Sequence, residues 1–330
     1  QILQLRDWFV PTLYHSGNDG SLLTTEAPTT PEPATRHNLR PPHETGFFGR
    51  RRELWQIECW LSEGTRRLSI NGFGGQGKTE LALEAGRWLL RTEMFEAAVF
   101  VDYTAVQGED ALAAAISTIG AVLGESLIDA TAVTEALRTT STLLILNNLE
   151  MVADAPLREL LDAAVAWSTA GGSRLLLTSR TPEFNHPDYR VEGTVKHRRL
   201  MLSGLGSAAY PDDALAWFEA LSKLPPAPTI RPPKREELVP LFDRVGFHPL
   251  SLAVLAQQLK TQRASQLDER LAAILATEVP AAMVIEGTPR SLVASLQLSL
   301  ELLDDAARHA VRRLGVFQGG AFEDDLLAIT

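Results

Sequence analysis

The chain is poor in cysteine, in long apolar runs and in net positive charge. Its 330 residues include one cysteine, Cys59, which excludes an intrachain disulfide and is typical of a reducing, cytoplasmic compartment. No apolar run approaches about 18 residues, so we expect no membrane span. With 31 Lys and Arg against 41 Asp and Glu, the net charge of -10 argues against nucleic acid as a partner. The 7 histidines include no pair at zinc-ligand spacing.

The chain does contain a phosphate-loop pattern at residues 72–79, GFGGQGKT. The apolar run at 68–71 precedes it and a helical pattern begins at Glu80, which is the strand–loop–helix context that the motif needs. Glycines let the backbone approach a polyphosphate without Cβ clashes, and N–H groups at the positive helix end attract the anion. The residues expected to hold the nucleotide here are Gly72, Gly74, Gly75, Gln76, Gly77, Lys78, Thr79 and Glu80.

Two of these residues have distinct chemical roles. Lys78 is expected to reach the β- and γ-phosphates, and the Thr79 hydroxyl is expected to ligate Mg²⁺. The alternative is a glycine-rich strand–helix turn that binds nothing. We interpret the motif as a site for a nucleoside triphosphate or its product, with Mg²⁺ as the metal.

Strand and helix patterns alternate around this motif and predict the fold class. The expected strands are 68–71, 97–102, 143–146, 174–178 and 197–202, and the expected helices include 51–62, 110–123 and 157–167. Such alternation predicts an α/β fold in which a parallel sheet is covered by helices on both faces. Beyond residue 205 the pattern is helical: 211–223, 234–245, 249–260 and 265–276, then 289–303, 304–314 and 323–329.

The segments before the phosphate loop differ in composition from the rest of the chain. Residues 1–23 combine a β-prone run with a turn-rich stretch and are interpreted as the end of a preceding domain. Residues 24–45 are rich in Thr, Pro and Glu and predict an extended linker. Because the first residue is Gln rather than Met, we expect the chain to be a piece of a longer polypeptide. The nucleotide-binding domain is then expected at 46–205.

Three further residues are candidates for metal binding and hydrolysis. A second phosphate-site strand should end in an acidic residue, but the strand at 143–146 is followed by Asn147. Glu150, three residues on, could orient the attacking water or could be a surface or capping charge. The next strand ends near Arg180, which could contact the γ-phosphate or form a structural salt bridge.

Taken in order, these motifs resemble the STAND class of signalling ATPases, in particular the NB-ARC (AP-ATPase) proteins. The resemblance covers residues 46–330 and depends on the Phe48-Gly49-Arg50 stretch, the phosphate loop, residues 143–150, residues 177–180 and GFHPL at 246–250. It implies a helical domain at 206–285 and the start of a winged-helix domain at 286–330. Residues 1–23 resemble, weakly, the end of a CHAT caspase-like effector domain.

The resemblance also implies roles for individual residues. In that family, the residues matching Phe48, Gly49 and Arg50 contact the base and sugar of ATP or ADP. The proline matching Pro249 packs on adenine, although a plain first-turn helix proline is the alternative. The arginine matching Arg180 senses the γ-phosphate. Lys78, Glu150 and Arg180 are therefore the catalytic candidates, and Thr79 and Asn147 are the metal candidates.

The function implied is an ATP/ADP switch that forms homo-oligomers with ATP and activates a fused or recruited effector, in bacterial immunity or programmed cell death. The trigger would be sensed by a region beyond residue 330. One alternative is a transcription regulator of the same class that binds DNA through its winged helix; another is a motor or kinase-like ATPase. The amide at Asn147 predicts slow hydrolysis, because Mg²⁺ prefers charged oxygen ligands, and whether Asn147 is natural or a substitution is left open.

Overall fold

The computed structural model describes residues 36–104, 110–191, 196–276 and 290–300. Contacts divide the chain into residues 1–35 and residues 36–330, and the description concerns the second unit. The predictions made for residues 1–23, for most of the linker and for the helices at 304–314 and 323–329 lie outside the described residues.

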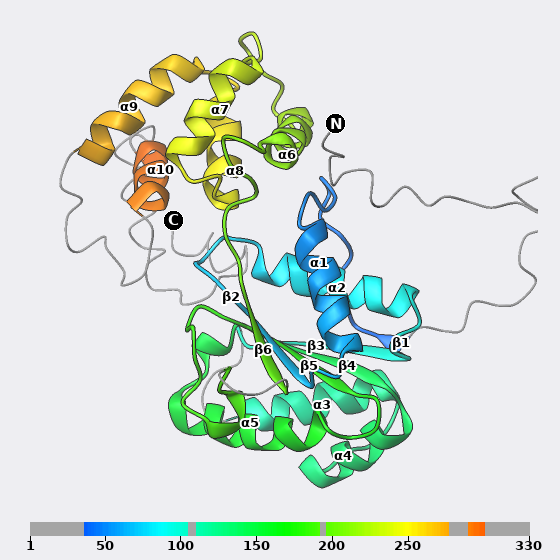
Figure 1. The fold of residues 1–330 in the computed structure, drawn as a ribbon. Coiled ribbons are helices and arrows are strands. Elements are labelled where there is room, and N and C mark those ends of the chain that lie inside the picture. The colour runs from blue at the N-terminus through cyan, green and yellow to red at the C-terminus, as the bar shows by residue number, and fades with distance from the viewer. Residues whose placement is uncertain (1–35, 105–109, 192–195, 277–289, 301–330) are drawn as a thin grey trace, which may run out of the picture. The chain divides into compact units, whose positions relative to one another are not determined.

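The described residues form a parallel sheet of six strands, as the apolar runs predicted. Its order is β1-β3-β4-β5-β2-β6 (Figure 1). The strands are β1 (Arg36–His37), β2 (Arg67–Asn71), β3 (Ala97–Asp102), β4 (Thr142–Asn147), β5 (Arg174–Ser179) and β6 (His197–Met201). In register, Asp102 lies opposite Asn147 and Asn71 lies opposite Ser179. The carboxyl ends of β2 to β5 therefore meet along one edge of the sheet, where ligands bind in open α/β folds.

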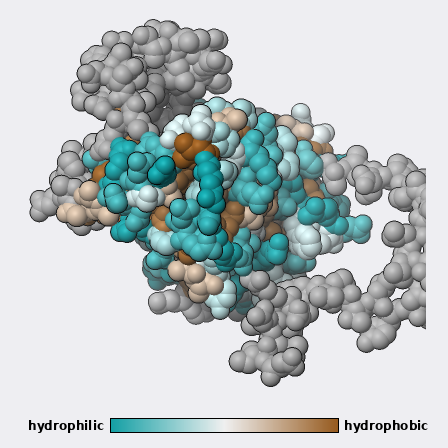
Figure 2. Space-filling model, turned by 90° about the horizontal axis from the view of Figure 1, so that it is seen from above, coloured by the Kyte–Doolittle hydropathy of each residue, from teal (hydrophilic) through white to brown (hydrophobic). Residues whose placement is uncertain are grey.

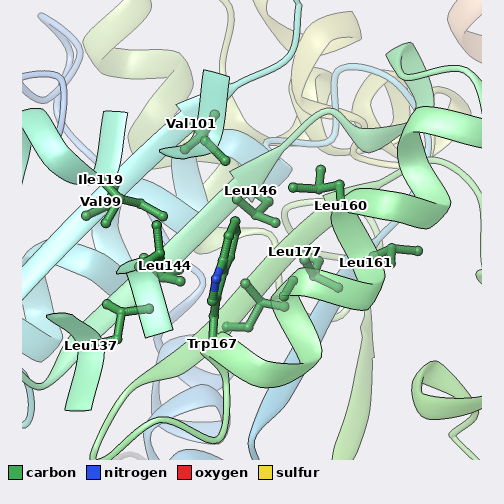
Figure 3. Packing of buried hydrophobic residues seen from close by; sticks show 14 of the residues in the cluster. Val99, Val101, Ile119, Leu137, Leu144, Leu146, Leu160, Leu161, Trp167 and Leu177 are labelled. Atoms are coloured by element: carbon green, nitrogen blue, oxygen red, sulfur yellow. The ribbon is translucent and has the colours of Figure 1, made fainter. Parts of the chain in front are cut away.

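Helices cover both faces of this sheet (Figure 1). They are α1 (Arg51–Ser62), α2 (Lys78–Arg91), α3 (Ala111–Leu123), α4 (Ala130–Thr139) and α5 (Asp154–Trp167). One apolar cluster joins α1 and α2 to the sheet, and a second joins α3, α4 and α5 to the other face. The fully buried Trp167 belongs to the second cluster, where leucines of neighbouring elements surround its indole ring (Figure 3).

Two elements depart from the sequence predictions. Part of the expected linker is ordered against the sheet: Arg36–His37 form strand β1 beside β3, and Leu39 is buried in the core. Helix α4 was not predicted, although Asp129 caps it by accepting a hydrogen bond from the Ala132 N–H at 2.8 Å. Its buried face at Val133 packs into the core and stabilises a segment whose threonines are weak helix formers.

The segment after β6 is helical where the sequence predicted it. It contains α6 (Asp212–Lys223), α7 (Arg235–Arg244), α8 (Pro249–Gln258), α9 (Ala264–Ala276) and α10 (Arg290–Leu300), which share a third apolar cluster. Seen from above, the described surface is largely hydrophilic, with apolar side chains in small areas (Figure 2). Among the described helices, none combines the length and apolar character needed to cross a membrane.

Candidate functional site

The phosphate loop connects β2 to α2, as predicted. Gly77 occupies the N-cap of α2 with φ of 85°, a conformation that side chains disfavour. Gly75 has φ of 75°, and a Cβ there would lie only 2.6 Å from the Leu250 Cβ. Glycine is therefore required at both positions, at Gly77 by conformation and at Gly75 by conformation and contact.

Lys78 closes the loop on itself. Its Nζ donates hydrogen bonds to the carbonyl oxygens of Gly72 (2.9 Å) and Phe73 (3.0 Å), and the residue is buried. Burial lowers the pKa of Lys78; the nearby Glu150 carboxylate opposes this shift and the Arg180 guanidinium adds to it. The lysine thus holds its cation at the inner side of a loop whose N–H groups suit an anion.

A cavity of about 190 Å³ opens beside the loop. Its lining combines loop glycines with most of the charged and polar residues predicted for phosphate and metal binding, but Asn147, a predicted metal residue, is fully buried and does not line it. The lining residues are Gly74, Gly75, Gly77, Lys78, Thr79, Glu80, Asn148, Glu150 and Arg180. Phe48, Gly49, Arg50 and Pro249, which the resemblance assigned to the base and sugar, do not line this cavity.

Asn147 and Thr79, the two metal candidates, are in direct contact. Thr79 Oγ1 donates to Asn147 Oδ1 at 2.9 Å, and Thr178 Oγ1 donates to the same oxygen at 2.7 Å. The Asn147 Nδ2 donates to Asp102 Oδ1 at 3.1 Å. The amide oxygen therefore points to the Thr79 hydroxyl, and Mg²⁺ accepts neutral oxygens of this kind together with phosphate and water. The described residues contain no group of three His, Cys, Asp or Glu that could hold a metal unaided.

Asp102 is a site residue that the sequence interpretation missed. Burial alone would raise the pKa of its carboxyl group, but hydrogen bonds from Thr104, Asn147 and Asn148 outweigh burial and hold the pKa below its ordinary value. Asp102 is therefore ionised at neutral pH. The available signal was its position as the last residue of a predicted strand, since parallel strands end at the same edge.

Glu150 and Arg180 form an ion pair at the cavity, with Arg180 Nε 3.1 Å from Glu150 Oε1. Glu150 lies in a single turn, Leu149–Met151, directly after β4, and Arg180 follows β5. The Arg180 guanidinium also lies close to the backbone of the loop: a Cβ added to Gly74 would be 3.3 Å from Arg180 Cζ. The structure thus contains the salt bridge that the sequence left open, with both partners beside the phosphate loop.

The stretch Phe48-Gly49-Arg50 leads into α1. Arg50 is buried, and its guanidinium donates to the carbonyl oxygens of Ser203 (2.6 Å) and Gln76 (3.2 Å). Gly49 has φ of 64°, and a Cβ there would lie 3.0 Å from Leu205 and from Asp213. Arg50 therefore joins the start of α1 to the phosphate loop and to the chain after β6, and its contact with the base and sugar stays a prediction.

The 246–250 stretch contacts the phosphate loop, although it is far away in sequence. Pro249 is the first residue of α8, and the next N–H, that of Leu250, donates to Gly75 O at 3.2 Å. His248, which precedes them, is buried, and neither ring nitrogen has a hydrogen-bond partner of standard geometry among the described residues. Burial lowers the pKa of His248, the Gly74 backbone opposes the shift, and the charges of Lys78 and Arg50 add to it.

No family model matches the chain, and no curated protein matches it. Its structure is similar to a Walker-type ATPase of Pyrococcus abyssi, with 13% identity, a TM-score of 0.50, and coverage of 84% of this chain and 79% of that one. It is also similar to AMPPCP-bound DnaA from Aquifex aeolicus, with 12% identity, a TM-score of 0.46, and coverage of 88% and 87%. Another similar structure is that of C. elegans PCH-2, with 12% identity, a TM-score of 0.36, and coverage of 76% of this chain and 68% of that one. The parallel sheet and the likeness to the Walker-type ATPase show that the chain has the fold of a P-loop NTPase, which confirms the predicted α/β class.

Proposed function

We propose that the chain is a nucleotide-operated switch of the STAND type, which binds ATP or ADP with Mg²⁺ at the phosphate loop. The observation that carries this proposal is the contact between that loop and the start of α8, where Leu250 N–H donates to Gly75 O at 3.2 Å. The helical segment that follows β6 is thus in direct contact with the backbone that is expected to bind phosphate.

The contact is close enough to transmit a change in the loop. The peptide groups of the loop are the expected phosphate donors, and the Leu250 side chain leaves no room for a Cβ on Gly75. A rearrangement of the loop by phosphate must therefore alter the contact with α8. A ligand shifts a conformational equilibrium by its differential contacts with the two states, and a γ-phosphate would supply one such contact at Arg180.

The chain's own residues have separate tasks in this proposal. Lys78 binds the phosphates, Arg180 contacts the γ-phosphate, and Glu150 positions water for slow hydrolysis. Thr79 and Asn147 are the residues that would hold Mg²⁺, which would neutralise phosphate charge when bound. The ATP state self-associates and drives a fused or recruited effector in response to a trigger. The resemblance to STAND ATPases suggests a role in bacterial defence against phage or in programmed cell death.

The test is the mass of the chain in solution by light scattering, with MgATP, with MgADP and without nucleotide. We expect multimers with MgATP only, and expect Lys78→Ala to remain at the nucleotide-free mass. A chain that binds MgATP and keeps the same mass in all three conditions contradicts the assembly step. A turnover number well above about once per minute, within the usual range of metabolic enzymes, would favour a working ATPase over a switch.

A further inference from the structure

The acidic group nearest the Thr79–Asn147 pair lies on the neighbouring strand. Asp102 Oδ1 accepts hydrogen bonds from the side-chain amides of Asn147 and Asn148, each at 3.1 Å. It also accepts one from Thr104 Oγ1 at 2.7 Å and one from the Thr104 N–H at 3.1 Å. These donors stabilise the carboxylate as an anion at the edge of the sheet.

This carboxylate, together with the Thr178 hydroxyl that donates to Asn147 Oδ1 at 2.7 Å, determines which way the Asn147 amide points. An amide carries a donor and an acceptor end, which are exchanged by a flip of the side chain. A flip would set the Asn147 oxygen against the Asp102 carboxylate and turn its N–H groups away from that acceptor. Asn147 is fully buried, so water cannot compensate. The orientation that satisfies Asp102 is the one that presents Oδ1 to the Thr79 hydroxyl.

We infer that Asp102 is the acidic positioning residue of the metal site, acting through Asn147. It fixes the amide oxygen toward the metal position beside Thr79 and supplies the negative charge that position 147 lacks. The inference rests on the proposed function, since it assigns a residue to the Mg²⁺ that accompanies the nucleotide. The competing role is purely structural, in which Asp102 only holds the ends of β3 and β4 together.

The same geometry explains why an acid at position 147 does not fit beside Asp102. An aspartate there would bring a second carboxylate to about the separation of a hydrogen bond, where two negative charges repel. Asn147 and Asp102 are therefore a matched pair, with the charge on β3 and the amide on β4. Exchanging them restores the donor–acceptor match between positions 102 and 147, because an asparagine at 102 can donate to an aspartate at 147. The exchange still loses the bonds that Asp102 Oδ1 accepts from the N–H groups of Thr104 and Asn148.

The test compares the full chain with three variants: Asp102→Asn, Asn147→Asp, and the double variant that exchanges the two residues. Nucleotide affinity is measured by titration with a fluorescent ADP analogue in Mg²⁺ and in EDTA. The ratio of the Kd in EDTA to the Kd in Mg²⁺, here called the Mg²⁺ effect, measures how much the metal strengthens nucleotide binding. Mn²⁺ binding in the presence of ADP, followed by electron paramagnetic resonance, gives a second readout. Asp129→Asn, at the cap of α4 away from the site, is the matched control.

We expect Asp102→Asn to reduce the Mg²⁺ effect about tenfold and to weaken Mn²⁺ binding, with affinity in EDTA unchanged. Asn147→Asp should lower Tm through repulsion, and the double variant should recover part of that Tm and at least the native Mg²⁺ effect. A folded Asp102→Asn chain with the native Mg²⁺ effect overturns the inference, as does equal loss in Mg²⁺ and EDTA.

Two further outcomes separate this inference from other failures. If Asp102→Asn does not fold, the double variant carries the test, and a Mg²⁺ effect below the native value in that variant contradicts the inference. If the native chain binds no nucleotide in either buffer, the proposed function fails and the inference fails with it. If the native chain binds nucleotide and the variants change affinity in Mg²⁺ but not in EDTA, the result supports both the inference and the proposed function.

Discussion

Arg180 Nε lies 3.1 Å from Glu150 Oε1, so the two charged residues that follow β5 and β4 are paired with each other beside the phosphate loop. The pair is unequal: the Arg180 side chain is 58% exposed and that of Glu150 is 14% exposed. The second carboxylate oxygen, Oε2, is buried and has no hydrogen-bond partner among the described residues. Arg180 is therefore the partner that can turn toward a ligand, while Glu150 stays fixed near Lys78.

Arg180→Ala should weaken ATP binding more than ADP binding, because the proposed partner of Arg180 is the γ-phosphate. A charge-assisted hydrogen bond contributes about 1.5–3 kcal/mol, so the ATP-to-ADP affinity ratio should fall roughly tenfold or more. Both affinities are measured by calorimetry. Arg138→Ala, which removes an exposed arginine paired with Glu135 on α4, is the control and should leave the ratio unchanged. Equal losses for the two nucleotides would assign Arg180 a structural role.

Lys78→Ala should weaken nucleotide binding strongly while the chain stays folded. The lysine is the cation that closes the loop, through hydrogen bonds to Gly72 O and Phe73 O. Losing these two bonds should cost about 1–3 kcal/mol of stability, whereas nucleotide affinity should fall by about a hundredfold, or about 2.7 kcal/mol. Titration with a fluorescent ATP analogue, together with thermal melting by circular dichroism, separates the two effects. Lys223→Ala, an exposed lysine of α6, is the control; a folded Lys78→Ala chain of native affinity would contradict the site.

Pro249→Ala tests whether the start of α8 contributes to adenine binding. As a first-turn helix residue, the proline should contribute little to stability, so an effect confined to Tm would indicate that simple role. The proposal predicts weaker ADP binding, about threefold to tenfold, with little change in Tm. Leu250→Ala is the companion variant, because it removes the side chain against Gly75 and retains the backbone hydrogen bond. ADP affinity and the Tm of the nucleotide-free chain are measured for both variants.

The sequence was sufficient for the sheet and the phosphate loop because both depend on local patterns. Runs such as 143–146 are apolar throughout, which is typical of strands covered on both faces. Strand β1 could not be predicted, because it is two residues long and exists through pairing with β3. Helix α4 carried a cap signal at Asp129, but its stability depends on packing that no local pattern specifies.

The residues of the candidate site also differ in whether the sequence alone could identify them. Lys78, Thr79 and Asn147 could be placed from their positions in a motif, whereas the role of Asp102 depends on the register between β3 and β4. The sequence alone predicts that Asn147→Asp speeds hydrolysis and shortens the life of ATP assemblies. The structure changes that expectation, because the new carboxylate would face Asp102; faster hydrolysis is now expected of the double variant.

The last prediction concerns stability in acid and the buried His197 of β6. Its Nδ1–H donates to Tyr189 O at 2.6 Å, and its Nε2 lies 3.2 Å from the Ser69 hydroxyl, so the neutral ring is satisfied on both sides. Burial lowers the pKa of His197 to about 4, the Tyr189 carbonyl opposes the shift, and the charges of Arg67 and Arg199 add to it.

In the unfolded chain a histidine has a pKa of about 6.5. Between about pH 6.5 and pH 4 the histidine is therefore protonated in the unfolded chain but neutral in the native one. The free energy of unfolding consequently falls as the pH falls. The full loss is about 3 kcal/mol on the scale of 1.36 kcal/mol per pKa unit. Urea unfolding at pH 7 and pH 5 should show a smaller pH-dependent loss for His197→Asn than for the native chain, whatever the variant's stability at pH 7. His43→Asn, at an exposed site, is the control; an equal loss in the native chain and His197→Asn would show that the native ring accepts a proton as readily as the unfolded one.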